Sequence, residues 1–565
     1  MKKKIILVLI AIVLIMVVVA VSFGATLIEK YSYSKEQADL DAYFKISSES
    51  DVALILHDEM MEERARLIDG TYYFDLATVH KYFNERFYVD KNENILLYTL
   101  PDAIIRNEIG TGFVSGGGGD ENYDYAVSIY KEETLYIAVD YVKKYTNFSY
   151  QTFTAPNRMQ LELSWEDREK AQIKKDTAVR VLGGIKSEIL ADVSKDDSVY
   201  ILEQMETWSK VKTGDAIIGY VENKMLSELT TESPIPVTDY EEPVYTSVTR
   251  DHKINLGWHV VAGIAGNDTI YEATASTKDL NVISPTWFKL SDNEGNFVSL
   301  ATQQYVDTAH GMGLEVWALL ENIEYKSSLD MYTMLSSTTT RARLIDNLIN
   351  EVLGYGIDGI NVDLEEINVD TGEHFIQFIR ELSIPCRENG IVLSIDNYVP
   401  YNFNDHYNRK EQGIVADYVI IMGYDEHYAG SDTAGSVASI DYVENGIART
   451  IDQVPAHKVI NAVPFYTRIW ETTGTSVSSQ AVGMELARQW IDNHSIETYW
   501  DETTCQNYGE YSADNTLHQV WLEDADSILV KLNIMHKYEI GGIAGWRLGY
   551  ETPAVWEVIS EYLAW

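Results

Sequence analysis

The chain has 565 residues, of which 45% are hydrophobic and 23% are charged, a composition typical of globular proteins and not of disordered ones. It carries 44 basic and 87 acidic side chains, and its net charge of −43 repels phosphate backbones, which excludes nucleic-acid binding as a main role. The two cysteines, Cys386 and Cys505, are too few for a disulfide-rich scaffold, a cysteine-based zinc module or an iron–sulfur protein.

The N-terminus combines lysines with a long apolar run. Lys2, Lys3 and Lys4 precede residues 5–23, which are apolar except for Ser22, and these 19 residues would span about 28 Å as a helix, close to the thickness of a hydrocarbon core. The lysines keep this end cytoplasmic, so the rest of the chain is expected outside the membrane. No clear A-x-A cleavage site follows, which favours an uncleaved signal anchor over residues 1–24; a cleaved signal peptide is the alternative.

A polar stretch and a weak internal repeat come next. Residues 25–48 lack periodicity and are expected to form a stalk, whereas residues 49–165 contain a doubled pattern. The segments 71–76 (TYYFDL) and 134–139 (TLYIAV) each lead into a short helical pattern and then into further strand patterns. This doubling resembles the stalk-type domain named after the N-terminus of copper amine oxidases, here without a cluster of copper ligands. The resemblance implies an α+β spacer or wall-contact module.

Residues 174–228 have the pattern of a small β-barrel, with short strands between turns and Trp208 near the middle. The expected strands are 178–181, 198–203, 208–211 and 217–221. Their order resembles a bacterial SH3-like domain, which implies contact with cell-wall peptides; a plain spacer is the alternative. Residues 229–249 contain three prolines and are expected to form an extended linker.

The largest block, residues 250–565, alternates strand patterns with helical patterns, which predicts an α/β fold. The expected strands are 254–261, 282–288, 315–320, 359–364, 392–397, 418–422, 459–464 and 542–546. Eight strands separated by helices predict a parallel (β/α)8 (TIM) barrel with insertions. In such barrels the active site lies at the carboxyl ends of the strands.

The fourth of these strands carries the strongest chemical signal. Because side chains alternate between faces along a strand, Asn361, Asp363 and Glu365 share one face, opposite the apolar residues of the same segment. The apolar face is expected against the helices, which aims the polar face into the mouth of the barrel. Neighbouring carboxyl groups separate their pKa values, so that one stays protonated near neutral pH, as glycosidic cleavage requires. A solvated acidic loop after a strand is the alternative interpretation.

Four motifs in chain order carry a family resemblance. Residues 358–365 resemble the D-x-x-D-x-D-x-E signature of glycoside hydrolase family 18, the chitinase family, with Asn361 in place of one aspartate. Residues 417–425 (DYVIIMGYD) and 463–470 (VPFYTRIW) resemble the family's sixth and seventh strands, and Gly545-Trp546 resembles its eighth. The resemblance covers residues 250–565. The segment 424–431 resembles the branch of bacterial spore-germination and cortex-lytic N-acetylglucosaminidases, which act on peptidoglycan.

The resemblance implies roles for individual residues. Glu365 acts as general acid and then base, while Asp363 holds the acetamide N–H and stabilises an oxazolinium-like cation formed by the substrate's own N-acetyl group. Asn361 orients Asp363 and raises its pKa less than a second aspartate would. Tyr424 donates its hydroxyl toward the acetamide oxygen, and Trp546 stacks on the sugar ring. The residues expected to shape the subsite are Met422, Asp425, Tyr466, Arg468 and Asp358.

The expected function is hydrolysis of β-1,4 bonds after N-acetylglucosamine in peptidoglycan, by an enzyme attached to the membrane and working in the cell wall. Hydrolysis of chitin or its oligomers is the alternative substrate choice. A non-catalytic glycan-binding protein and a wall-attachment scaffold are the alternative classes. No metal or other cofactor is expected, because His259 and His427 are isolated and no loop has EF-hand spacing. The phosphate-loop and nucleophile-elbow motifs are also missing from the sequence.

Overall fold

The computed structural model describes residues 2–236 and 240–565 and divides the chain into two compact units. The first unit comprises residues 1–87, 107–114 and 121–242, and the second comprises residues 88–106, 115–120 and 243–565. The segment 49–165, expected from its repeat to form one domain, is therefore shared between the two units.

The first unit begins with helix α1 (Lys2–Tyr31), which is longer than the predicted 1–24 segment. The helix is long and apolar enough to cross a membrane, judged by length and composition, and its apolar side chains are exposed. Exposed apolar side chains over this length need a lipid environment or a partner. The signal anchor stays a prediction.

The repeat forms a seven-stranded sheet in the order β11-β12-β1-β2-β3-β10-β9. Its elements are β1 (Asp51–Leu56), β2 (Glu59–Ile68), β3 (Thr71–Asp75), α3 (Leu76–Tyr82), β9 (Ser128–Lys131), β10 (Thr134–Ala138), α4 (Val139–Lys144), β11 (Ser149–Phe153) and β12 (Arg158–Glu162). Each copy of the repeat runs directly from a strand into a short helix, as the sequence predicts. The strands of the two copies, β3 and β10, pair antiparallel, with Phe74 opposite Ile137.

A second seven-stranded sheet follows, in the order β15-β14-β18-β17-β16-β13-β19. Its strands are β13 (Arg168–Gln172), β14 (Thr177–Arg180), β15 (Ile189–Val193), β16 (Ser198–Gln204), β17 (Trp208–Thr213), β18 (Ile218–Glu222) and β19 (Thr230–Glu232). The four strands predicted here correspond to β14, β16, β17 and β18. One apolar cluster, which includes Ile55 and Val211, joins this sheet to the first. The SH3-like and stalk-type assignments stay predictions.

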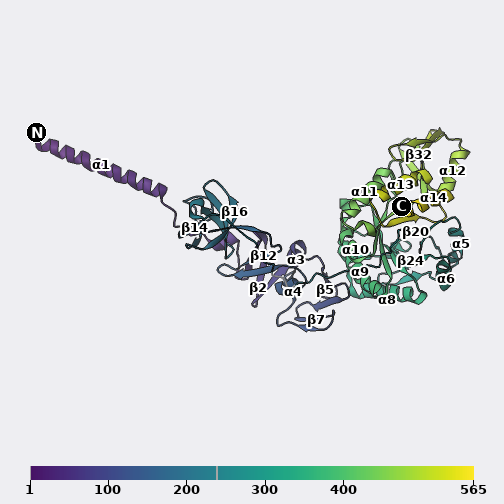
Figure 1. Ribbon diagram of the computed structural model, residues 1–565, viewed down its shortest axis with the longest axis horizontal. Helices are drawn as coiled ribbons and strands as arrows, with labels where there is room; N and C mark the ends of the chain where they lie inside the picture. The colour runs from purple at the N-terminus through teal and green to yellow at the C-terminus, as the bar shows by residue number, and fades with distance from the viewer. Residues whose placement is uncertain (1, 237–239) are drawn as a thin grey trace. The chain divides into compact units, whose positions relative to one another are not determined.

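The second unit contains a closed barrel of eight parallel strands, which confirms the predicted fold (Figure 1). The strands are β20 (Ile254–His259), β21 (Val282–Pro285), β24 (Glu315–Glu321), β25 (Gly359–Asp363), β26 (Val392–Tyr398), β27 (Tyr418–Met422), β28 (Val459–Pro464) and β34 (Gly542–Trp546). Pairing of β21 with β24 closes the ring, and β22 (Phe288–Leu290) and β23 (Phe297–Ser299) extend its edge.

Two apolar layers build the barrel. Trp258, Trp317 and Ile420 belong to the cluster inside the ring of strands, whereas Ile360 and Val362 belong to the cluster between strands and helices. Successive residues of each strand therefore alternate between the two clusters, as the period of two requires. The apolar face of β25 lies against the helices, which confirms the predicted orientation of its polar face toward the interior.

The helices around the strands are α5 (Ile270–Ala273), α6 (Gln303–Gly311), α7 (Met331–Ser336), α8 (Thr338–Tyr355), α9 (Val369–Asn389), α10 (Arg409–Val415), α11 (Ile440–Ile451), α13 (Ala525–Lys537) and α14 (Pro553–Leu563). The two longest of these follow ordinary capping rules. Ser337 and Asn368 accept backbone N–H groups at the starts of α8 and α9, and Gly356 and Gly390 end them with φ of 69° and 67°.

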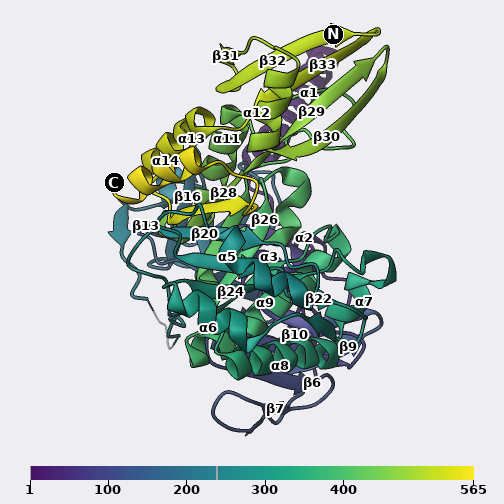
Figure 2. The same ribbon diagram turned by 90° about the vertical axis from the view of Figure 1, so that its right-hand side faces the viewer.

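An insertion between β28 and β34 forms a separate five-stranded antiparallel sheet with helix α12 (Figure 2). Its elements are β29 (Tyr466–Thr473), β30 (Ser476–Gly483), α12 (Met484–Asn493), β31 (Tyr499–Asp501), β32 (Gln506–Ala513) and β33 (Thr516–Leu522). The insertion leaves the barrel at the carboxyl end of β28, so it begins at the rim where the site is expected. The motif at 463–470 thus belongs to two strands, β28 and β29.

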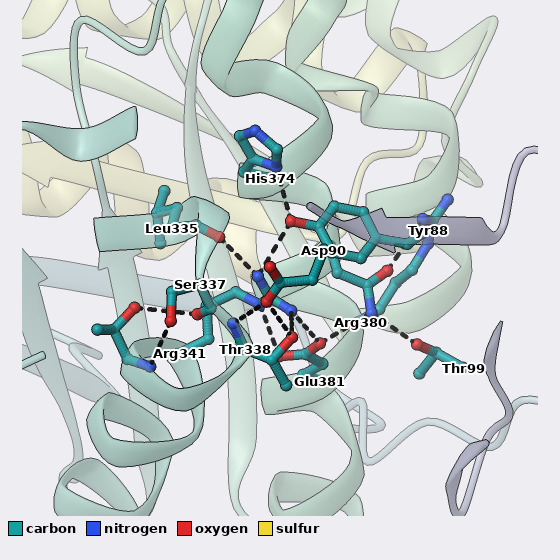
Figure 3. Close-up of polar contacts among 12 residues, drawn as sticks. Tyr88, Asp90, Thr99, Leu335, Ser337, Thr338, Arg341, His374, Arg380 and Glu381 are labelled. Atoms are coloured by element: carbon teal, nitrogen blue, oxygen red, sulfur yellow. Dashed lines mark hydrogen bonds and ion pairs between the residues drawn. The ribbon is translucent and has the colours of Figure 1, made fainter. Parts of the chain in front are cut away.

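Residues 88–106 pack against the barrel helices through a buried polar network (Figure 3). They include most of β4 (Phe87–Asp90), β5 (Ile95–Thr99) and part of β6 (Ile104–Glu108). Arg341 donates to both carboxylate oxygens of Glu381 at 2.8 and 2.9 Å, and also donates to the Tyr88 hydroxyl at 3.1 Å. Asp90 accepts the backbone N–H of Thr338 at 2.6 Å, at the start of α8.

We expect Glu381→Gln to lower the free energy of unfolding of this unit by about 3–5 kcal/mol, because it leaves the Arg341 charge buried without its counter-charge. Both side chains are at most 2% exposed. Glu294→Gln is the matched control, since Glu294 forms an exposed ion pair with Arg343 and its loss costs less than about 1 kcal/mol. Urea unfolding of the full-length protein in detergent measures both, and equal losses in the two variants would contradict the expectation.

Candidate active site

The inner face of the barrel changes from apolar to polar at one end of three neighbouring strands. In β24 the inward side chains run from Trp317 and Leu319 to Glu321, and β25 and β26 end in the same way, in Asp363 and Tyr398. These positions are the carboxyl ends of parallel strands, where barrel enzymes place their chemistry. Burying several carboxyl groups together is costly, which marks the rim as a candidate site.

Asn361 lies fully buried below this rim, and its side-chain amide forms hydrogen bonds to side chains of other barrel strands. Its Oδ1 accepts the indole N–H of Trp258 at 2.8 Å and the Ser284 hydroxyl at 3.3 Å. Its Nδ2 donates to Asp396 Oδ1 at 2.8 Å and to Ser394 Oγ at 3.1 Å. These bonds correct the expectation that Asn361 orients Asp363, because the carboxylate that the amide holds is Asp396, on the neighbouring strand.

Asp363, the last residue of β25, has a buried oxygen without a partner. Its Oδ1 lies away from solvent and accepts no hydrogen bond from any residue that the structure describes. Burial raises the pKa of this carboxyl well above its usual value, and the neighbouring Asp396, Glu365 and Glu321 raise it further. The acidic neighbour that raises the pKa of Asp363 from the next strand is therefore Asp396, whereas Asn361 is an amide. The atom is suited to accept an N–H group from a bound ligand.

Glu365 is held at the rim by two neighbours. The Asn322 side chain accepts the Glu365 backbone N–H and donates to its carbonyl oxygen, both at 2.9 Å. The Tyr398 hydroxyl donates to Glu365 Oε2 at 2.7 Å. Burial raises the pKa of Glu365, the hydrogen bond from Tyr398 lowers it, and Asp425 and Glu366 raise it. A carboxyl group in this environment is suited to donate a proton.

Glu365 also lines a hollow of about 270 Å³ beside the rim. The other residues that line it come from the loops after β24 and β25 and from α7 and α9: Asn322, Ile323, Lys326, Leu329, Asp330, Met331, Tyr332, Glu366, Asn368 and Thr371. The hollow is open to solvent on one side and contains both polar and apolar side chains. It is large enough to receive part of a sugar chain next to the proton donor.

Two tyrosines line the adjoining part of the rim, next to β26. Tyr424 follows β27, and its ring meets that of Tyr466 edge to face, with centroids 6.2 Å apart. The Tyr466 hydroxyl donates to Asp425 Oδ1 at 2.5 Å. Burial raises the pKa of Tyr424 well above its usual value, and Asp363 adds to this, so the hydroxyl keeps its proton and can donate it in a hydrogen bond. Met422, the last residue of β27, is buried beneath them.

Trp546 ends the last barrel strand and remains partly exposed. It packs beside the inner cluster and meets Trp258 edge to face, with centroids 5.8 Å apart. Trp258 also donates a hydrogen bond to Asn361, so it contacts both Trp546 at the rim and the buried amide. Trp546 therefore offers an aromatic surface next to the carboxyl groups.

Arg468, in β29, donates to Ser479 at 3.3 Å, while its Nε is buried without a partner among the described residues.

Asp358 lies at the other end of the barrel, which corrects its assignment to the substrate site. It precedes β25, and its Oδ2 accepts the backbone N–H of Val316 at 2.8 Å and contacts His310 Nε2 at 2.7 Å. A residue before a parallel strand lies at the amino-terminal face, which serves stability in these barrels. The five residues of β25, Gly359–Asp363, cross the length of the barrel.

Three site residues escaped the sequence analysis: Asp396, Tyr398 and Asn322. Ser394, Asp396 and Tyr398 alternate in β26 just as Asn361 and Asp363 do in β25, and that alternation was available in the sequence. Asn322 had no such signal, because its contact with Glu365 joins two loops.

Burial raises the pKa of Asp396 to about 8, so this carboxyl group holds a proton near neutral pH.

Both cysteines are free, with Cys386 buried and Cys505 partly exposed. Among the residues that the structure describes, no three His, Cys, Asp or Glu side chains are grouped as metal ligands would be.

Fold and site together define the class of protein: a (β/α)8-barrel with buried carboxyl groups at its carboxyl-terminal rim. The family model for glycosyl hydrolases family 18 matches residues 321–551, which contain Asp363, Glu365, Tyr424 and Trp546. This match identifies a family 18 glycosyl hydrolase domain over residues 321–551, a domain of a glycosidase family.

Curated proteins of similar sequence agree with this family match. The chain is 30% identical over 241 residues to the putative sporulation-specific glycosylase YdhD of Bacillus subtilis (strain 168), covering 40% of this chain and 55% of that protein. It is 26% identical over 251 residues to the cortical fragment-lytic enzyme of the same organism, covering 43% of this chain and 58% of that protein. The chain thus spans little more than half the length of these relatives.

Solved structures share the fold. The C-terminal domain of a putative chitinase from Desulfitobacterium hafniense DCB-2 matches with a TM-score of 0.51 at 18% identity, covering 55% of this chain and all of that one. The spore cortex-lytic enzyme SleL of Bacillus cereus matches with a TM-score of 0.50 at 22% identity, covering 59% of this chain and 78% of that one. At these identities the likeness concerns the fold alone.

Proposed function

We propose that the protein is a retaining glycosidase that cleaves β-1,4 bonds after N-acetylglucosamine, with the acetamide group of the substrate as nucleophile. The observation that carries the proposal is the buried Asp363 Oδ1, which has no partner among the described residues and lies beside a proton donor, Glu365. An acetamide N–H supplies the missing donor. The membership of the barrel in family 18 supports the same reaction class.

The reaction begins when Glu365 gives its proton to the glycosidic oxygen. As the bond between that oxygen and the anomeric carbon breaks, the acetamide carbonyl oxygen bonds to the anomeric carbon and forms an oxazolinium ion. Asp363 accepts the acetamide N–H and stabilises the positive charge. Glu365, now a carboxylate, takes a proton from a water molecule that attacks the anomeric carbon. The bond between that carbon and the acetamide oxygen breaks as the water adds, which regenerates the acetamide, restores the acid and retains the configuration.

Two aromatic residues complete the proposed sugar site. Tyr424 keeps its proton in its buried environment and donates its hydroxyl toward the acetamide oxygen as that atom approaches the anomeric carbon. Trp546 offers its partly exposed indole to the apolar face of the ring. Met422, Asp425 and Tyr466 support these groups from below. The carboxyl groups, the hydroxyl and the indole thus surround a single sugar residue.

We propose peptidoglycan as the substrate. The two curated relatives are named a sporulation-specific glycosylase and a cortical fragment-lytic enzyme, and the latter name describes action on fragments of the spore cortex. Helix α1 would hold the enzyme at the outer side of the membrane, where the wall polymer is found. The small β-sheet domain of residues 168–232 would contact wall peptides. Chitin oligomers carry the same acetamide and are the alternative substrate.

We expect Glu365→Gln to lower kcat by about 10²–10⁴-fold, because the variant cannot protonate the leaving oxygen, while glycan binding is retained. Release of reducing ends from muropeptides and from N-acetylglucosamine oligomers measures the loss. Asp358→Asn is the matched control, an acid-to-amide change in the same motif at the opposite end of the barrel, and should keep the rate within about twofold. Wild-type protein that binds glycans without cleaving them would contradict the proposal and indicate a glycan-binding protein.

Tyr398→Phe should move the alkaline limb of the kcat/KM profile to higher pH. The Tyr398 hydroxyl stabilises the charged form of Glu365, so its removal raises the pKa of Glu365 further and keeps the acid protonated at higher pH. Tyr407→Phe is the control, because the Tyr407 hydroxyl accepts the backbone N–H of Ile367 and bonds no carboxylate of the site. An unchanged limb in Tyr398→Phe would show that Glu365 does not set it.

A further inference from the structure

We infer that Asp396 is a positioning residue that shares one proton with Asp363 across two neighbouring strands, and that Asn361 is an amide because it must donate to Asp396. The inference rests on the proposed function, in which Asp363 carries the negative charge opposite the oxazolinium ion. In the resting site the pair holds one proton. As the cation forms, the proton stays on Asp396 and the negative charge stays on Asp363. No proton enters or leaves the pair in this step.

The register of the sheet places the two carboxyl groups side by side. β25 and β26 pair in parallel, with Asn361 opposite Ser394 and Val362 opposite Ile395. One further step along this register brings Asp363 opposite Asp396, on strands about 4.8 Å apart. Both side chains face the interior, because Val362 and Ile395 belong to the outer cluster. Two carboxyl groups so placed in a buried site cannot both ionise freely.

The orientation of the Asn361 amide follows from the chemistry of its partners. An indole N–H only donates, so Trp258 fixes Oδ1 on its own side and turns Nδ2 toward Asp396. Aspartate at 361 would instead place a carboxylate oxygen 2.8 Å from Asp396 Oδ1, in a position that is 0% exposed. With Oδ1 of Asp396 occupied by the amide, Oδ2 carries the shared proton.

Like charges surround the pair on every side. The titratable and charged groups that act on it, directly or through Glu365, are Glu321 at the end of β24, Asp363, Glu365 and Glu366 at the end of β25, Tyr398 in β26, Tyr407 after β26, Tyr424 and Asp425 after β27, and Lys326 in the loop after β24. Lys326 acts on Glu365, at the outer edge. The pair itself is surrounded by acids, and retention of a proton is the way it stays buried.

Three variants of the full-length protein in detergent test the inference: Asp396→Asn, Asn361→Asp and the double exchange. Each single change should lower kcat at least about tenfold, and the double exchange, which returns the second carboxyl group to β25, should recover most of that loss. Asp396→Asn should also move the acidic limb of kcat/KM to higher pH, because an amide donates a weaker hydrogen bond than a protonated carboxyl group and stabilises the negative charge on Asp363 less. Ile395→Val, on the outer face of the same strand, should leave that limb in place.

A readout independent of activity uses thermal unfolding between pH 4 and pH 8. A carboxyl group whose pKa is about 8 when folded and 3.8 when unfolded binds more protons in the folded protein, so stability falls as pH rises through this window. Asp396→Asn should flatten that decline. An unmoved acidic limb, an unchanged decline, or a double exchange no better than the worse single variant would overturn the inference. Wild-type protein that cleaves no glycan would refute the proposed function, while the unfolding measurement still decides the shared proton.

Discussion

Four carboxyl groups, Glu321, Asp363, Glu365 and Asp396, end up on the inner wall of one barrel rim because their strands are parallel and in register. Removing a carboxylate from water costs several kcal/mol unless a partner compensates it. The neighbours of Asp363 are largely other acids, and burial raises the pKa values of Asp363, Glu365 and Asp396, so these three groups reduce the cost by keeping protons. A site that must hold protons near neutral pH is also one that can give a proton to a leaving group.

The apolar core below the rim makes this arrangement rigid. Trp258 and Trp317 fill the interior of the barrel, and Trp258 bonds Asn361 from below while it supports Trp546 at the side. One buried indole thus positions both the amide that holds Asp396 and the aromatic surface proposed for the sugar. Groups fixed in this way need little reorganisation when charge develops on the substrate, which is the main source of electrostatic catalysis.

The eight barrel strands could be predicted to within a few residues, because alternation and strand length are local properties of the sequence. The inward aim of Asp363 and Glu365 followed from the same local rule. The hydrogen-bond partner of Asn361, Asp396, could not be predicted in this way, because the bond joins two strands whose register is set by the closed sheet. Asp358 was misplaced because a motif spacing does not tell which end of a strand each residue occupies. The five-stranded insertion was not predicted, because the motif at 463–470, in which it begins, was interpreted as one strand.

The boundary of the barrel domain shows why long-range contacts elude a sequence pattern. Residues 88–106 belong by pattern to the repeat, yet they pack on α7, α8 and α9. The Tyr88 hydroxyl contacts His374 Nδ1 at 2.7 Å, and the His374 ring meets Tyr332 edge to face at 4.9 Å. Tyr332 lines the hollow that contains Glu365. One wall of the proposed substrate site is therefore supported by a segment more than 200 residues upstream, which ties the stability of that wall to the N-terminal half of the chain.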